Sequence, residues 1–224
     1  MAGQLVLPFG VQAALGPEDF ILSRCNEAAF RFVESWPDWP AHAAALHGPE
    51  GSGKTHLARI WSGKSGAAIL HASALTAKTP ACFDADLAMV VEDVDTVGPG
   101  LERDRALFAL LERKSGALLL TGRAPPSEWA VVLGDLTSRL AALLAFPVWA
   151  PDEALLGGLA RKLFSDRQLQ VPDSVIRRIL LTVDRTPTAI SAFVAQLDDC
   201  SLAERRPVTE RLVLDLLDGM EATR

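Results

Sequence analysis

The chain has 224 residues, of which 49% are hydrophobic and 22% are charged, and its formal net charge at pH 7 is −6. This composition predicts a folded globular protein with a core of its own and excludes a disordered chain. The negative net charge also argues against a protein that binds duplex DNA through bulk electrostatic attraction.

The sequence contains no pattern for export, for a membrane span or for a structural metal site. Its first 23 residues hold no Lys or Arg, so a secretory signal would lack its basic region. No long apolar run of membrane-spanning length occurs, and Cys25, Cys82 and Cys200 form no C-x-x-C pair. We therefore expect a cytoplasmic protein with reduced thiols and no membrane contact.

Strand and helix patterns alternate through the first 150 residues. Residues 1–19 carry Gly and Pro without helical periodicity and predict an extended arm. The apolar run at 87–91 is typical of a parallel strand that is buried on both faces. The alternation predicts an α/β fold in which helices flank a parallel sheet. The expected strands are 43–46, 67–71, 87–91, 116–121 and 145–149, and the expected helices are 26–36, 55–60, 101–114, 127–133 and 136–143.

From residue 151 onward only helical patterns occur, at 152–166, 173–183, 188–198 and 208–217. Asp152 and Asp173 are the expected N-caps of the first two of these helices. We therefore expect three parts: an N-terminal arm at 1–19, an α/β nucleotide-binding core at 20–150 and a small α-helical lid at 151–224.

A complete G-x-x-x-x-G-K-[ST] motif follows the first predicted strand. Its glycines let successive backbone N–H groups face phosphate oxygens, and Lys54 can reach the β- and γ-phosphates. The Thr55 hydroxyl is a candidate Mg²⁺ ligand, and His56 lies in the first turn of a helix whose N-terminus faces the anion. The motif predicts an ATP or ADP site formed by Gly48, Pro49, Glu50, Gly51, Ser52, Gly53, Lys54, Thr55 and His56.

Two acidic residues, Glu92 and Asp93, end the buried strand at 87–91. In phosphate-loop enzymes one carboxylate near this point helps to hold Mg²⁺ and another activates water. We assign Glu92 to the metal and Asp93 to catalysis. The alternative is a solvent-exposed acidic turn, because Asp95 follows as well.

Two further segments each admit a functional and a structural interpretation. Arg139 lies on the predicted helix 136–143, and its guanidinium suits the charge on a transferring phosphoryl group, but a lone Arg is more often a solvated side chain. The segment Gln4-Leu5-Val6-Leu7-Pro8-Phe9 suits a hydrophobic groove on a partner. Its alternative is an edge strand or a staple on the chain's own surface, and composition does not separate the two.

These elements, in this order, resemble the AAA+ module of the bacterial DnaA replication-initiator family, and more closely the short regulatory DnaA homologues called Hda. The resemblance covers nearly the whole chain. Residues 20–26 are similar to the family segment that packs around adenine, which implies contacts from Phe20 and Ile21. Residues 90–94 occupy the Walker B place, and residues 120–126 look like the sensor I strand.

The same resemblance assigns roles to the two ambiguous segments. Residues 135–140 closely match the arginine-finger segment of Hda, which implies that Arg139 acts in trans on a neighbouring nucleotide. The arm resembles the Hda peptide that docks on the DNA polymerase III sliding clamp (the beta subunit), which implies clamp contacts from Gln4, Leu5, Leu7, Pro8 and Phe9. No helix-turn-helix follows residue 224, so we expect neither an initiator nor direct sequence-specific DNA binding.

The sequence departs from the family pattern at three positions near the γ-phosphate. The acidic pair is Glu92-Asp93 instead of Asp-rich, Arg123 follows Gly122 where the initiator has Ser-Asp, and Thr188 replaces the sensor II Arg. Arg185 lies one turn before Thr188 and is a candidate substitute. These departures imply weak intrinsic hydrolysis with nucleotide binding retained.

The resemblance implies an Hda-like negative regulator of replication initiation that holds ADP or ATP with Mg²⁺, binds the clamp and stimulates ATP hydrolysis by DnaA. An autonomous AAA+ ATPase of helicase-loader type is one alternative, and it predicts substantial turnover without partners. A nucleotide-binding adaptor without catalytic function is the other, and it predicts that Arg139 is dispensable. Self-association into a homodimer stays open.

Overall fold

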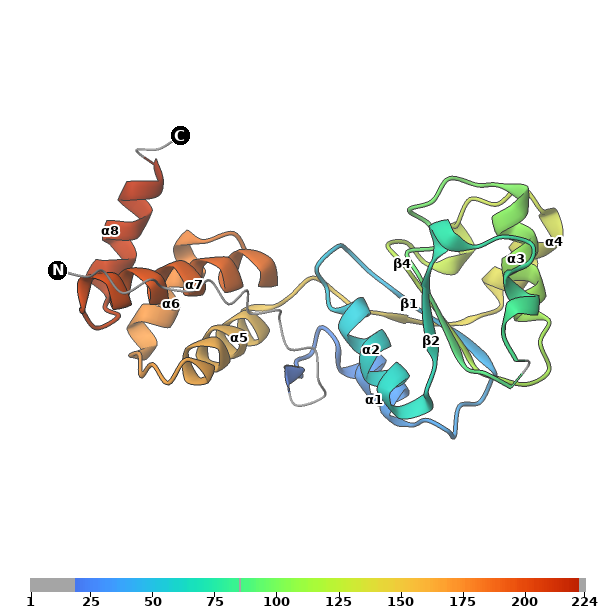
Figure 1. Ribbon diagram of the computed structural model, residues 1–224, viewed down its shortest axis with the longest axis horizontal. Coiled ribbons are helices and arrows are strands. Elements are labelled where there is room, and N and C mark those ends of the chain that lie inside the picture. The colour runs from blue at the N-terminus through green and yellow to red at the C-terminus, as the bar shows by residue number, and fades with distance from the viewer. Residues whose placement is uncertain (1–18, 85, 222–224) are drawn as a thin grey trace, which may run out of the picture.

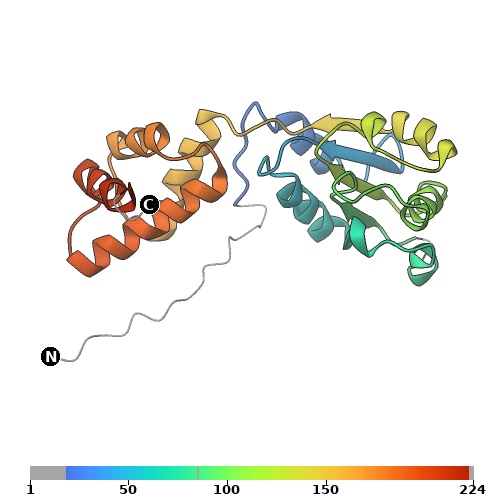
Figure 2. The same cartoon turned by 90° about the horizontal axis from the view of Figure 1, so that it is seen from above.

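The computed structural model describes residues 19–84 and 86–221, which form two lobes along the long axis of the molecule (Figure 1). The sequence-predicted clamp residues Gln4, Leu5, Leu7, Pro8 and Phe9 lie outside the described residues. The strands and the first four α-helices make up one lobe, and the last four helices make up the other (Figure 2).

The first lobe is built on a five-stranded, all-parallel sheet in the order β2-β3-β4-β1-β5. This arrangement confirms the predicted α/β class. In the register, His47 of β1 lies between Gly122 of β4 and Pro147 of β5, so the carboxyl ends of these three strands meet at one edge. The strands are β1 (Ala43–His47), β2 (Ala68–His71), β3 (Met89–Glu92), β4 (Leu118–Gly122) and β5 (Leu144–Pro147).

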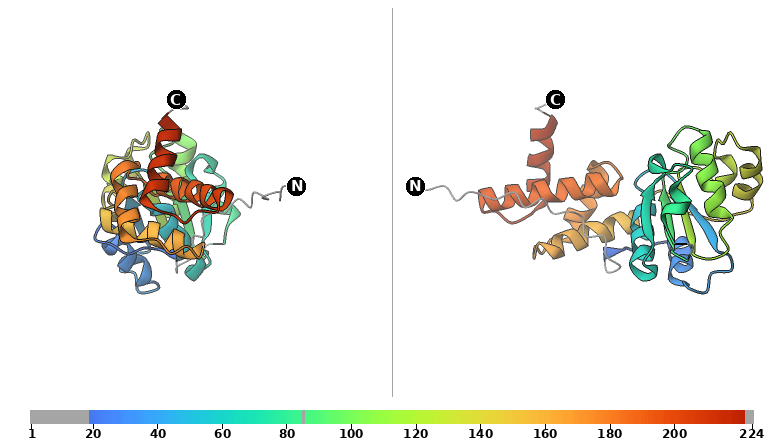
Figure 3. Two further views of the ribbon diagram at one scale, coloured as in Figure 1. Left: turned by 90° about the vertical axis from the view of Figure 1, so that its left-hand side faces the viewer. Right: turned by 45° about the vertical axis from the view of Figure 1, so that its right-hand side comes forward.

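Alternate strand residues fill two hydrophobic clusters, one on each face of the sheet. Ala44 and Leu46 join the cluster formed with α1 (Glu27–Glu34) and α2 (Lys54–Ser65). Ala43 and Ala45 join the opposite cluster, formed with α3 (Leu101–Leu111) and α4 (Gly134–Ala141). Because side chains alternate across a strand and helices cover both faces of the sheet (Figure 3), the central strands are apolar except near their carboxyl ends, where His47, Glu92 and Thr121 lie.

The predicted helix at 127–133 is wrong. A short 3₁₀ turn, Pro126–Glu128, is followed by irregular backbone. The amides of Val132 and Leu133 donate to Oδ2 of Asp104, at 2.5 and 3.1 Å, instead of to carbonyls of a helix. A buried carboxylate from α3 therefore determines the path of this segment, and periodicity along the chain does not reveal such a partner.

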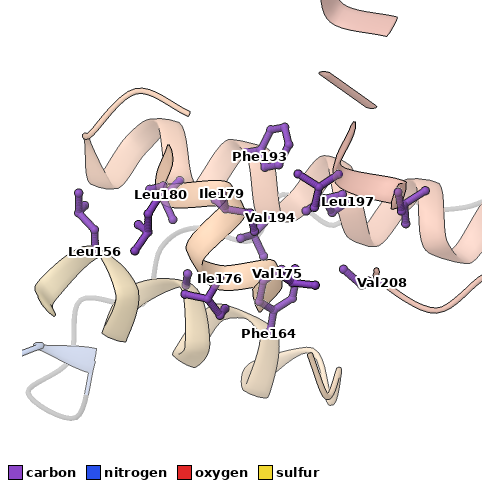
Figure 4. Packing of buried hydrophobic residues seen from close by; sticks show 14 of the residues in the cluster. Leu156, Phe164, Val175, Ile176, Ile179, Leu180, Phe193, Val194, Leu197 and Val208 are labelled. Atoms are coloured by element: carbon purple, nitrogen blue, oxygen red, sulfur yellow. The ribbon is translucent and has the colours of Figure 1, made fainter. Parts of the chain in front are cut away.

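The second lobe contains α5 (Glu153–Asp166), α6 (Asp173–Thr182), α7 (Pro187–Glu204) and α8 (Glu210–Glu221). These helices pack around a separate apolar cluster that includes Leu156, Phe164, Ile179 and Val194 (Figure 4). The same cluster contains Cys25, which lies in the segment that precedes α1. This contact links the second lobe to the first part of the chain.

The two expected N-caps behave differently. Asp152 caps α5, because its Oδ1 accepts a hydrogen bond of 2.7 Å from the amide of Leu155. Asp173 is instead the first residue of α6, and Pro172 occupies the N-cap position. The Asp173 carboxylate accepts from Arg161 of α5, so its role is an exposed ion pair between helices.

Candidate functional site

The phosphate loop connects β1 to α2, and two of its glycines are required by the backbone. Gly53 has φ +104° at the N-cap of α2, a conformation that residues with a Cβ rarely adopt. Gly48 has φ +152°, and a Cβ there would lie 1.9 Å from the carbonyl oxygen of Val148. The loop is therefore packed directly against the chain that leaves β5, and its turn places backbone N–H groups at the start of α2.

Lys54, the first residue of α2, lies beneath this loop and is only 7% exposed. Its Nζ donates to the carbonyl oxygens of Gly48 and Pro49, at 2.8 and 2.9 Å. Burial lowers the pKa of Lys54, and the carboxylates of Asp93 and Asp95 partly oppose that shift. A buried ammonium favours an anionic ligand, so Lys54 fits a phosphate.

A cavity of about 440 Å³ opens beside the loop, a volume within the usual range for small-molecule sites. The structure brings most of the predicted cofactor residues together there, while Gly48 and Pro49 contribute through the carbonyls that accept from Lys54. Lining residues that the sequence analysis had proposed for the site are Phe20, Ile21, Glu50, Gly51, Ser52, Gly53, Lys54, Thr55, His56 and Asp93.

One end of the cavity is aromatic and apolar. The ring of Phe20 stacks on Phe30 with 5.1 Å between centroids, and it meets the edge of His56 at the same distance. Leu155 and Leu159 of α5 line the same cavity, and sequence reasoning missed both. Flat rings beside aliphatic side chains suit a nucleobase, so this end fits adenine.

Asp93 also lines the cavity and lies just beyond the carboxyl end of β3. Its backbone has φ +56°, and its amide donates to the buried hydroxyl of Thr121 on β4, at 3.0 Å. His71 of β2 approaches the Asp93 carboxylate, with 3.6 Å between Nε2 and Oδ2. A non-glycine residue in the left-handed region is uncommon and occurs often at functional sites, so this geometry supports a role for the Asp93 carboxylate.

Glu92 and Thr55 are the predicted Mg²⁺ ligands. Glu92 is not among the residues that line the cavity, but its Oε1 is buried without a hydrogen-bond partner, and so is the hydroxyl of Ser52. Within residues 19–84 and 86–221, no group of three or more His, Cys, Asp or Glu side chains could hold a metal alone. Mg²⁺ usually combines one or two protein oxygens with phosphate oxygens and water, so these residues fit that mode.

Arg123, which the family resemblance places near the γ-phosphate, and Asp95, which the sequence shows only as part of an acidic turn, add two charges to the site. Arg123, after β4, lines the cavity, and its Nη2 lies 2.8 Å from Oε2 of Glu50 in the phosphate loop. Asp95 accepts hydrogen bonds from the backbone amides of Arg123 and Ala124, at 2.7 to 2.9 Å. The acidic turn after β3 is thus a fixed support for the segment that follows β4.

The two sensor II candidates lie in different surroundings. Thr188 of α7 lines the cavity with Pro187. Arg185 is paired with Glu153 of α5, with 3.0 Å between Nη2 and Oε2, and both side chains are largely exposed. This contact therefore joins the segment before α7 to α5 within the helical lobe.

Arg139 lies on α4, which packs on the opposite face of the sheet from α2. Its guanidinium pairs with Glu112 and lies over the ring of Phe108, with 4.6 Å from Cζ to the ring centroid. The side chain is 40% exposed and lines an open hollow with Phe108, Asp135, Ser138 and Ala142. It is not one of the residues that line the nucleotide cavity.

The parallel sheet in this strand order, with a phosphate loop between β1 and α2, defines the AAA+ fold. No family model matches the sequence. The fold is similar to domain III of the replication initiation protein DnaA of Thermotoga maritima, with a TM-score of 0.72, 16% identity and coverage of 90% of this chain and 95% of that domain.

Two further solved structures show the same likeness. The Holliday junction branch migration motor RuvB of Thermotoga maritima has a TM-score of 0.73 at 14% identity, with 92% of this chain and 72% of RuvB covered. AMPPCP-bound DnaA of Aquifex aeolicus has a TM-score of 0.67 at 16% identity, with 81% and 64% covered, so this chain matches less than two thirds of that protein. At these identities the likeness establishes the fold.

None of the helices within the described residues combines the length and the apolar content that a membrane span requires.

Proposed function

We propose that this protein binds ADP or ATP with Mg²⁺ at the phosphate loop and presents Arg139 to ATP held by a DnaA partner. It would thereby promote conversion of ATP-DnaA to ADP-DnaA, as an Hda-like negative regulator of replication initiation. The observation that supports this most strongly is the placement of Arg139 on the face of the sheet opposite α2, outside the cavity of its own chain.

The chain's own nucleotide has a structural part in this proposal. Lys54 and the amides at the start of α2 would hold the phosphates, and Thr55 and Glu92 would hold Mg²⁺. When bound, Mg²⁺ neutralises charge on the β- and γ-phosphate oxygens. The cavity is lined by both lobes, because Leu155 and Pro187 come from helices of the second lobe. Bound nucleotide would therefore fix the lobes relative to each other.

Arg139 would act on the partner's nucleotide. Its guanidinium is permanently charged, and its planar fork matches two phosphate oxygens. A guanidinium supplied in trans accelerates hydrolysis by about 10³- to 10⁵-fold in the best-studied GTPases. The contacts with Glu112 and Phe108 leave the side chain 40% exposed, so a partner can reach it.

The proposed clamp contact rests on the sequence of the arm. Gln4, Leu5 and Phe9 give this segment one polar and two apolar side chains, a composition that suits a peptide docked in a hydrophobic groove. Each buried Leu or Phe contributes about 1.5–3 kcal/mol before the costs of ordering. Changing both Gln4 and Leu5 to Ala should therefore weaken retention on immobilised clamp at least about tenfold. Equal retention of this variant and wild type would favour an arm that packs on its own chain.

The decisive experiment measures hydrolysis of labelled ATP pre-bound to DnaA, with and without this protein and with and without DNA-loaded clamp. We expect acceleration only when the protein and the loaded clamp are both present. The same assay on the pure protein should show slow ATP turnover, below about 1 s⁻¹. Ordinary turnover by the pure protein, with no effect on DnaA, would favour the autonomous ATPase instead.

A further inference from the structure

Two residues at the C-terminal end of α3 hold the side chain of Arg139. Phe108 and the C-cap residue Glu112 are about one helical turn apart, so their side chains project from the same face of α3. Cζ of Arg139 lies 4.6 Å from the centroid of the Phe108 ring, and its Nη1 pairs with Oε1 of Glu112. The helices α3 and α4 lie side by side (Figure 1), and Leu107 and Leu140 anchor them in one buried cluster. The core therefore fixes the positions from which both contacts are made.

The two contacts use different parts of the guanidinium. A cation is attracted electrostatically to the face of an aromatic ring, so the Phe108 contact requires none of the N–H donors of Arg139. The Glu112 carboxylate, in contrast, takes the donor at Nη1. Carboxylate and phosphate oxygens both match the guanidinium fork, so a phosphate would need the donor that Glu112 occupies. The ring contact can therefore persist when Arg139 binds a phosphate, whereas the Glu112 contact has to give way.

The surroundings of Arg139 permit that exchange. The ion pair with Glu112 is partly exposed, and such pairs contribute little to stability, so it can be broken easily. The small side chains of Ser138 and Ala142 line the hollow beside the guanidinium, which leaves room for an anion. Asp135 lines the same hollow. Two carboxylates beside one guanidinium disfavour a free anion, so the phosphate has to be delivered by a docked protein.

We propose that Phe108 and Glu112 are positioning residues for Arg139, with opposite effects on its action in trans. Phe108 holds the guanidinium in the pose in which it meets the phosphate of a nucleotide on the partner, and so sets the maximum stimulation. Glu112 holds the same guanidinium in the free protein and is displaced by that phosphate, and so raises the protein concentration that stimulation requires. This inference rests on the proposed function, in which Arg139 acts on ATP held by DnaA.

The test titrates full-length protein against DnaA that carries labelled ATP, with loaded clamp present, and separates the maximum rate from the half-maximal concentration. We expect Glu112→Gln to lower the half-maximal concentration about two- to fivefold without lowering the maximum rate, because a neutral amide competes less well than a carboxylate. Glu204→Gln is the matched control, since Glu204 has the same 48% exposure as Glu112 and pairs with Arg206. The control should change neither quantity.

Phe108→Leu tests the ring. Leucine keeps an apolar side chain against the core but offers no ring face, so we expect the maximum rate to fall about two- to fivefold. Phe108→Trp should recover most of that rate, because indole is the best aromatic partner for a cation. Leucine would suffice for a residue that only packs against the core, so the difference between the two variants reports positioning.

A second measurement needs no partner protein. The arginine reagent phenylglyoxal must reach the guanidinium nitrogens, and mass spectrometry of the digested protein gives the rate of modification at Arg139 itself. We expect faster modification of Arg139 in Glu112→Gln than in wild type, with the largely exposed Arg185 as the internal reference in both digests. Equal rates at Arg139 would overturn the inference, because Glu112 would then not hold the guanidinium.

The hydrolysis assay separates this inference from the function on which it rests. Unchanged kinetics in Glu112→Gln and Phe108→Leu, or a lower maximum rate in both, would overturn the inference and leave catalysis in trans by Arg139 intact. A wild-type protein that does not accelerate hydrolysis on DnaA would overturn the proposed function, and this inference with it.

Discussion

The nucleotide cavity and the Arg139 face are built by different means. The cavity depends on backbone conformation, with left-handed glycines, a buried lysine and strand ends that meet at one edge. The Arg139 face depends on side chains of two surface helices, and its arginine is held by one carboxylate and one aromatic ring. The first arrangement is formed within this chain, whereas the second, in the function that we propose, acts only on a partner protein that covers it.

The largest expected effect tests the Arg139 face. Arg139→Ala should remove most of the stimulation of DnaA-bound ATP hydrolysis, a loss of about 10³-fold or more if the side chain acts as a finger in trans. ADP binding by this protein should be unchanged, because Arg139 is not part of the cavity lining. The measurement follows labelled ATP on DnaA over time with loaded clamp present.

Arg139→Lys provides the matched variant for this comparison. It keeps the charge but loses the planar fork, so we expect little recovery of stimulation. Full stimulation by Arg139→Ala would exclude catalysis in trans by this residue. The protein would then be an adaptor that uses its nucleotide for structure alone.

The second expected effect concerns a buried ion pair in α3 that contacts both the segment after β3, near the cavity, and the segment before α4, which carries Arg139. Arg103 and Asp104 of α3 are 5% and 0% exposed, and Nη2 of Arg103 lies 2.7 Å from Oδ1 of Asp104. Arg103 also donates to the Val94 and Val97 carbonyls beyond β3, while Asp104 accepts from the segment that precedes α4. One buried pair thus supports the chain on both sides of the sheet edge.

Asp104→Ala should lower the free energy of unfolding by about 3–5 kcal/mol, because it leaves the Arg103 charge buried without its partner. Urea unfolding of wild type and variant measures the difference. Arg178→Ala, which breaks the exposed pair with Glu210, is the control and should cost at most about 1 kcal/mol. A similar small loss for Asp104→Ala would show that the two regions do not depend on this pair.

The contrast between the two regions also explains what could be predicted from the sequence. The phosphate loop is encoded by contiguous residues, and the parallel sheet is encoded by apolar runs that need no knowledge of distant partners. The Asp104 carboxylate, in contrast, accepts hydrogen bonds from amides 28 and 29 residues away, and the local pattern at 127–133, which predicts a helix, contains no sign of that partner.

Charged residues of the site were the hardest to place. Asp95 had the features of an ordinary acidic turn, and Arg123 appeared only as a departure from a pattern, because neither has a sequence signature for the contact that it makes. Leu155 and Leu159 come from the second lobe, a hundred or more residues after the phosphate loop, and only the folded chain brings them to the cavity.

The third expected effect concerns the cavity itself. Lys54→Ala removes the buried ammonium beneath the loop and should weaken ADP binding about 10- to 100-fold, the usual range for a lost hydrogen bond to a charged group. Lys64→Ala, at the far end of the same helix, is the control, since Lys64 pairs with Glu34 of α1. Titration with a fluorescent ADP analogue measures both. Unchanged binding by Lys54→Ala would show that the cavity does not hold phosphate.

The smallest expected effect is a pH dependence of folding stability that arises from His47, near the nucleotide cavity. His47 ends β1 next to the loop, and burial lowers its pKa below 6.5, an effect that the charge of Glu128 opposes and the charge of Lys54 reinforces. As the pH falls through 6.5, the unfolded chain binds a proton at this residue that the folded chain does not yet bind. Stability is therefore lost as the solution is acidified toward the folded-state pKa.

Gln does not titrate, so in His47→Gln the folded and unfolded chains no longer differ in proton binding at this position. The variant should therefore lose less stability than wild type between about pH 7 and pH 5. Thermal melts across this range measure the difference, and NMR titration of the His47 ring in wild type measures its pKa directly. A ring that titrates at or above 6.5 would contradict the prediction. Saturating ADP should shift the titration upward, because phosphate charge near Lys54 would offset the positive charge that His47 experiences.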